Sequence, residues 1–100
     1  MSIIEIQKAF IEKRFRYTKH GVEQRINRSI TSKEIEQAIL KGEIIEDYPS
    51  DKYGPSLLIY GKTKRGKALH IQIALLPIIS IVTAYEPDPA EWIEGKIRRK

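Results

Sequence analysis

The chain has 100 residues, of which 41% are hydrophobic, and a formal net charge of +5 at neutral pH. This length predicts a single domain over residues 1–100, large enough to bury one core. The absence of cysteine excludes a disulfide scaffold, a thiol nucleophile and a thiolate metal site. The basic balance favours anionic partners such as nucleic acid, and a requirement for solubility alone accounts for it nearly as well.

The sequence indicates neither a signal peptide nor a membrane span. The start of the chain, Met1 to Glu5, has no basic region before a continuous apolar run. The longest apolar run, residues 73–79, contains Pro77 and is shorter than the roughly 20 residues that cross a bilayer. We therefore expect a cytoplasmic protein that does not bind membranes.

The first predicted element is a helix over residues 3–14, because apolar side chains recur there at helical spacing. An extended piece over residues 15–18 follows it. The second predicted helix runs from about His20 to Arg28. We expect its buried stripe to consist of Val22, Ile26 and Ile30.

The third predicted helix has the clearest boundaries. Thr31 and Glu34 have the spacing of a capping box, in which each side chain accepts a hydrogen bond from the other residue's amide. Its predicted apolar face consists of Ile35, Ala38 and Ile39. Gly42 stands where a left-handed residue commonly ends a helix.

After Gly42 the hydrophobic period changes to that of strands. Turn formers separate four predicted strands, at residues 43–48, 56–62, 67–76 and 78–85. The short loops between them favour antiparallel hairpins. Asp88 and Pro89 then have the residue types preferred at the cap and first position of a helix, so a short C-terminal helix containing Trp92 is predicted.

These elements predict an α+β fold. N-terminal helices would pack on one face of a four-stranded, mainly antiparallel sheet, with the short C-terminal helix at the end. The opposite face would be more open. His70 and Gln72 alternate with core residues of the third strand and would project onto it.

His20 and His70 are the two histidines of the chain and the candidate acid–base residues, because imidazole changes charge near neutral pH. Catalysis by both would require that they line one cationic hollow. The alternative for His20 is a helix residue bonded to nearby backbone. The alternative for His70 is a half-buried ring bonded to a cross-strand hydroxyl, such as that of Thr83 or Tyr60.

Arg25 and Tyr85 complete the candidate catalytic set. Arg25 and Arg28, three residues apart, would share a helix side and suit a phosphate, although a solvated charged face is as good an explanation. Tyr85 would donate to a phosphate oxygen or pack on Trp92. The candidate substrate-binding residues are Lys19, Arg28, Arg65 and Thr83. No metal site and no cofactor is predicted.

Several segments resemble a widespread family of small prokaryotic domains of unknown function, over roughly residues 15–95. The segments that carry this resemblance are Tyr17-Thr18-Lys19-His20, Arg25, Ile30-Thr31-Ser32, Asp47-Tyr48-Pro49, Gly54-Pro55-Ser56, Leu69-His70 and Val82-Thr83-Ala84-Tyr85-Glu86-Pro87-Asp88.

That family is in turn distantly similar to toxins of the RelE/ParE and BrnT type, and Lys19-His20-Gly21-Val22 resembles a segment of the BrnT group. The similarity implies a RelE-like fold, RNA cleavage and pairing with an antitoxin protein.

Three functions follow as expectations. The first is a metal-independent ribonuclease or toxin-like domain, in which His20 and His70 transfer protons, Arg25 holds the phosphate and Tyr85 donates to it. The second is a non-catalytic module that binds nucleic acid or protein. The third is an interaction domain whose open sheet face or edge pairs with another chain. RNA and an antitoxin are the implied partners, and the sequence does not fix the oligomeric state.

Overall fold

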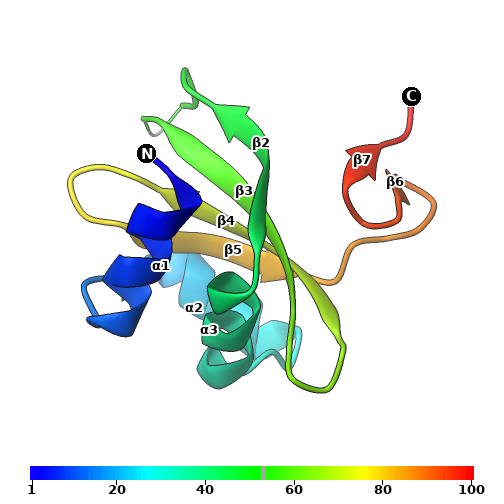
Figure 1. Ribbon diagram of the computed structural model, residues 1–100, viewed down its shortest axis with the longest axis horizontal. Coiled ribbons are helices and arrows are strands. Elements are labelled where there is room, and N and C mark those ends of the chain that lie inside the picture. The colour runs from blue at the N-terminus through cyan, green and yellow to red at the C-terminus, as the bar shows by residue number, and fades with distance from the viewer. Residues whose placement is uncertain (53) are drawn as a thin grey trace.

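The computed structural model describes residues 1–52 and 54–100. Helices come first along this part of the chain: α1 (Ile3–Ile11), α2 (Lys19–Asn27) and α3 (Ser32–Leu40), with the short strand β1 (Arg16–Tyr17) between α1 and α2 (Figure 1). The later elements are strands: β2 (Glu43–Tyr48), β3 (Ser56–Lys62), β4 (Ala68–Ala74), β5 (Ser80–Tyr85), β6 (Trp92–Ile93) and β7 (Ile97–Arg98).

The central sheet has five strands in the order β1-β5-β4-β3-β2. Three neighbouring pairs are antiparallel, whereas β1 pairs with β5 in parallel. The α+β class is thus confirmed, but the prediction of a four-stranded, mainly antiparallel sheet is wrong. The fifth strand forms because the amides of Arg16 and Thr18 donate to the carbonyls of Ile79 and Ile81, each at 3.0 Å.

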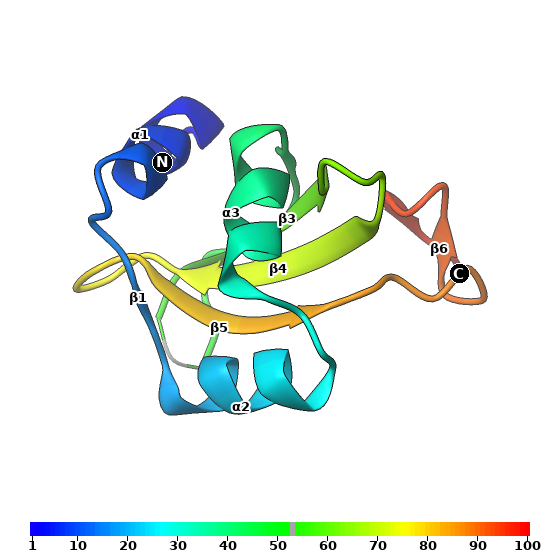
Figure 2. The same ribbon diagram turned by 90° about the horizontal axis from the view of Figure 1, so that it is seen from below.

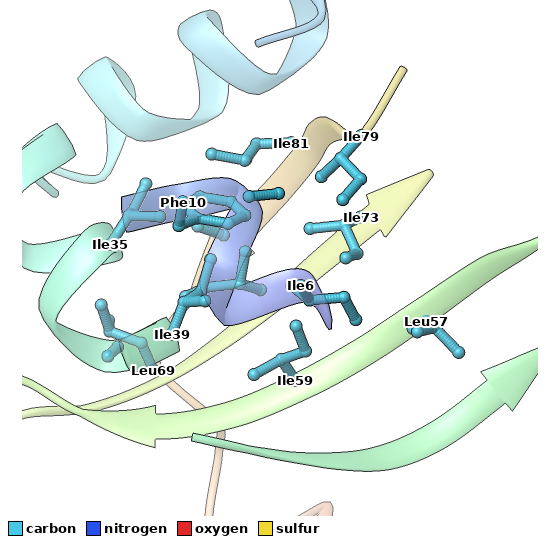
Figure 3. Packing of buried hydrophobic residues seen from close by; sticks show 14 of the residues in the cluster. Ile6, Phe10, Ile35, Ile39, Leu57, Ile59, Leu69, Ile73, Ile79 and Ile81 are labelled. Atoms are coloured by element: carbon cyan, nitrogen blue, oxygen red, sulfur yellow. The ribbon is translucent and has the colours of Figure 1, made fainter. Parts of the chain in front are cut away.

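The core lies between the sheet and helices α1 and α3, which cover one face of it (Figure 2). Isoleucine dominates this layer, and side chains from β3, β4 and β5 meet those of α1 and α3 around Phe10 (Figure 3). The capping box of α3 is confirmed, since Thr31 Oγ1 accepts from the amide of Glu34 at 3.0 Å and Glu34 Oε1 accepts from the amide of Thr31 at 2.9 Å.

Helix α2 lies alongside β5 and makes its closest approach through a glycine. A Cβ atom on Gly21 would stand 2.2 Å from the carbonyl oxygen of Ile81. This contact explains why the predicted stripe on α2 is only partly correct. Ile30 is buried beyond the end of the helix, but Val22 is half-buried and Ile26 is 60% exposed.

The predicted C-terminal helix is wrong, because the segment forms the β6–β7 hairpin. Asp88 does cap a turn, its carboxylate accepting from the amide of Ala90 at 2.9 Å. The turn does not propagate, since Glu94 and Gly95 adopt positive φ and reverse the chain. Gly42 also differs from its predicted left-handed role: it does not adopt positive φ, and a Cβ there would stand 2.8 Å from the carbonyl oxygen of Ala38.

No helix in the described part of the chain is long and apolar enough to cross a membrane.

Candidate functional site

The sheet face opposite α1 and α3 carries the polar side chains of the central strands. His70 and Gln72 alternate with core residues of β4 and therefore project onto this face, as expected. One end of the face is hollowed. The β6–β7 hairpin covers His70 at the other end.

The hollow has a volume of about 660 Å³ and lies where β1, β5 and β4 meet the first turn of α2. Ligand pockets commonly have volumes of about 300–1,000 Å³. Cationic, anionic, neutral polar and apolar side chains contribute to its lining: Arg16, Thr18, His20, Asp51, Gln72, Ala74, Leu76, Ser80 and Val82.

Arg16 is the guanidinium of the hollow. Its Nε donates to Oγ of Ser80 at 3.0 Å, and Ser80 donates in turn to the carbonyl oxygen of Ile78 at 2.9 Å. Ser80 is 3% exposed, so this anchor is rigid, while Arg16 itself is exposed. The arrangement fixes the direction of the side chain and leaves the terminal nitrogens as donors for an anion.

Thr18 positions the imidazole at the start of α2. Its Oγ1 accepts from the amide of Gly21 at 2.9 Å and donates to the carbonyl oxygen of Ile81 at 3.2 Å, which ties the helix start to β5. Lys19 and His20 then occupy the first two helical positions, and both are exposed. Two groups able to carry positive charge thus stand beside the hollow, where the helix dipole also favours an anion.

Asp51 supplies the carboxylate of the hollow. Its Oδ2 accepts from Oγ of Ser56 at 2.9 Å and from Nε2 of Gln72 at 3.3 Å. Its Oδ1 accepts from the amide of Lys52 at 2.8 Å. A carboxylate oxygen has more than one acceptor position, so a fixed Asp51 can still accept from a ligand hydroxyl.

Sequence reasoning identified His20 in this hollow but missed Arg16, Asp51 and Ser80. The parallel pairing of β1 with β5 brings Arg16 to Ser80, 64 positions away, and no local pattern marks that pairing. Asp51 lies among the turn formers between the first two predicted strands, and turn formation was the only role expected of it. The one local signal for Arg16 is its position, two residues before the helix cap Thr18.

His70 lies outside the hollow and is fully buried. Its Nε2–H donates to the carbonyl oxygen of Gly95 at 2.5 Å, so the neutral ring accepts from the hydroxyl of Tyr85 at Nδ1, 3.3 Å away. The rings of Tyr60 and Trp92 pack edge-on against it. The two histidines therefore do not line one hollow, and the acid–base pair expected from the sequence does not form.

Burial lowers the pKa of His70. The Gly95 carbonyl and Glu46 raise this pKa, but burial outweighs both, and Arg98 lowers the pKa further. Because the unfolded chain binds a proton near pH 6.5 and folded His70 binds it only at a lower pH, stability is full above about pH 6.5 and falls as the pH decreases. We expect the free energy of unfolding in urea to fall between about pH 7 and 5, by at most about 1.4 kcal/mol per pH unit.

A His20→Asn variant is the matched control, because His20 is exposed. It is expected to retain the same pH dependence, whereas His70→Gln should be less stable and should have a flatter profile. A pH dependence that His20→Asn removes would contradict this assignment.

Tyr85, Thr83 and Arg28 form a second polar group on the same sheet face. Nη1 of Arg28 donates to Oγ1 of Thr83 at 3.1 Å and to the carbonyl oxygen of Ala84 at 2.9 Å. The guanidinium carbon lies 5.8 Å from the centre of the Tyr85 ring. Burial raises the pKa of Tyr85, whose hydroxyl is engaged by His70.

Arg25 and Arg65 lie away from the hollow. Nη1 of Arg25 donates to the carbonyl oxygen of Ile30 at 3.2 Å, and its guanidinium lies 5.7 Å from the centre of the Tyr17 ring, so it braces the end of α2. Arg65 is exposed in the β3–β4 turn. It lines a separate depression of about 470 Å³ together with residues of α3, such as Lys33 and Gln37.

Within residues 1–52 and 54–100, no cluster of histidine and carboxylate side chains could hold a metal ion.

Comparison with known proteins gives one finding. Residues 17–90 match the profile of a family described as "Domain of unknown function (DUF4258)". The match includes every lining residue of the hollow except Arg16, which precedes it, and it also includes Arg28, Thr83 and Tyr85. It ends before β6. No curated protein and no solved structure matches the chain.

Proposed function

The chain belongs to this family of domains of unknown function, DUF4258, and we propose that the domain binds single-stranded RNA through the hollow beside α2. The observation that carries the proposal is the joint lining of one concave site by a fixed guanidinium, an exposed imidazole and a fixed carboxylate. The net charge of +5 adds a general attraction for nucleic acid.

Each part of a nucleotide has a matching group in the hollow. A phosphate suits Arg16, whose planar guanidinium forms paired hydrogen bonds with phosphate oxygens. A base suits the apolar side chains of Leu76 and Val82. Asp51 repels phosphate but accepts from a ribose hydroxyl, and the 2′-hydroxyl distinguishes RNA from DNA. This last match favours RNA over DNA.

We expect a fluorescently labelled single-stranded RNA to bind, with an affinity that falls steeply between about 50 and 200 mM salt. Arg16→Gln should weaken binding about tenfold or more, because a charge-assisted hydrogen bond contributes about 1.5–3 kcal/mol. It should also reduce the slope of log affinity against log salt by about one, which is the contribution of one phosphate contact. Fluorescence anisotropy measures both quantities.

Arg99→Gln is the matched control, since it removes the same charge from an exposed residue outside the hollow. Its affinity should stay near that of the parent chain. Equal losses in both variants would show that binding depends on net charge and not on the hollow. An equal affinity for DNA of the same sequence would contradict the role of Asp51.

Cleavage of the bound RNA is a second candidate function, because His20 and Asp51 line the same hollow and both can transfer protons. The same incubations, run with a chelator and resolved on a gel, distinguish the two. Shortened products ending in a cyclic phosphate, formed by the parent and not by His20→Asn, would favour cleavage. Intact RNA at saturating protein would favour binding alone.

A further inference from the structure

We infer that the RNA site continues from the hollow along β5 to a second anion and base subsite at Arg28, so that the protein contacts a strand of several nucleotides. This inference rests on the proposed RNA binding at the hollow. The evidence for the second subsite is the position of Arg28, which lies outside the hollow.

Arg28 is held firmly but keeps free donors. Its Nη1 is used by Thr83 and Ala84, and its guanidinium rests near the Tyr85 ring. Among the residues that the structure describes, no carboxylate forms an ion pair with Arg28. A fixed, unpaired guanidinium can bind a phosphate through its remaining nitrogens and can stack a base on its plane.

The polar group formed by Arg28, Thr83 and Tyr85 lies on the same sheet face as the hollow. Thr83 is the cross-strand partner of Gln72, which lines the hollow, and directly paired residues project to the same side. Tyr85 is likewise the partner of His70. The track therefore runs from the hollow along β5 to Arg28, and it ends where Trp92 packs on His70.

Helix α2 sets the length of this track, because His20 stands near its start and Arg28 caps its end. Eight residues at a rise of about 1.5 Å separate the two positions by about 12 Å. A stacked strand advances about 3.4 Å per nucleotide, so the track spans roughly three to four nucleotides. Binding should consequently strengthen with RNA length up to this size and then level off.

The experiment measures competition by oligouridylates of increasing length against the labelled RNA. For the parent chain we expect affinity to rise about tenfold between the mononucleotide and oligomers of roughly three to four nucleotides. Arg28→Gln should remove this rise and leave mononucleotide binding unchanged. Lys62→Gln, which removes one charge from the exposed end of β3, should keep the rise.

Arg28→Lys keeps the charge and should recover part of the rise in affinity with length. Such a recovery would show that the loss in Arg28→Gln is not caused by unfolding. If Arg28 were only structural, its substitution would weaken all lengths equally, and that result would overturn the inference. A parent chain that binds every length alike would overturn it too, while the hollow would remain the RNA site. Failure of all lengths to bind would instead refute the proposed function.

Discussion

Replacing Trp92 with alanine is expected to lower the free energy of unfolding by about 3–5 kcal/mol, the usual cost of removing a buried aromatic ring. Trp92 is 2% exposed, and its ring centre lies 4.4 Å from that of His70 and 4.5 Å from the Arg98 guanidinium. The strands of the β6–β7 hairpin have two residues each, and an isolated hairpin is marginally stable in water. Its attachment therefore depends on this ring.

Two ion pairs also hold the hairpin on β2, Arg98 with Glu46 at 2.9 Å and Lys96 with Glu43 at 3.2 Å. Exposed pairs of this kind contribute about 0–1 kcal/mol each, too little to replace the ring. Trypsin should therefore cut the Trp92→Ala variant within residues 96–100 much faster than the parent chain. Denaturant unfolding measures the loss of stability.

Ile97→Ala is the matched control, because Ile97 lies on the same hairpin and is 64% exposed. Its stability should stay within about 0.5 kcal/mol of the parent, as for most surface substitutions. Trp92→Phe, which keeps an aromatic ring, should fall between the two. A Trp92→Ala variant as stable and as resistant to trypsin as the parent would show that the ring does not hold the hairpin.

The strands could be predicted closely where local punctuation is strong. The predicted strands over residues 43–48 and 56–62 match β2 and β3 at both ends, because Gly42 precedes one and turn formers separate the two. The helix after Thr31 is likewise fixed by its capping box. These features depend on neighbouring residues, which a sequence displays directly.

The features that failed depend on contacts between distant residues. The extended piece over residues 15–18 contains β1, but so short a segment cannot be assigned to the sheet until Ser80 and Ile81 lie beside it. Asp88 and Pro89 carry helix-start signals, but the packing of Trp92 on His70 favours a hairpin. Long-range packing of this kind overrides local propensity.

The candidate site, too, could be predicted only as far as local patterns determine it. Alternation correctly placed His70 opposite the core of β4, yet it could not show that the hairpin covers this residue. Periodicity gives the face of a strand on which a side chain lies. Whether that face is open depends on the rest of the chain, and here the open part begins at Gln72.

Substituting alanine for Gly21 is expected to destabilise the protein by about 1–3 kcal/mol, although alanine is normally about 1 kcal/mol better than glycine inside a helix. The added Cβ would stand 2.2 Å from the carbonyl oxygen of Ile81, a backbone atom that already accepts from Thr18. To relieve this steric overlap, α2 must move away from β5. That movement displaces His20 and Arg28 together, because both belong to α2 or its cap.

RNA affinity should therefore fall about tenfold or more in Gly21→Ala, at protein concentrations and temperatures where the variant is folded. Asn27→Ala is the matched control on the same helix, since Asn27 is exposed and alanine there adds only helix propensity, a gain of about 0.5 kcal/mol. It should be slightly more stable than the parent and bind RNA equally well. A Gly21→Ala variant that is stabilised, or that keeps full affinity, would show that the close approach of α2 to β5 does not position the site.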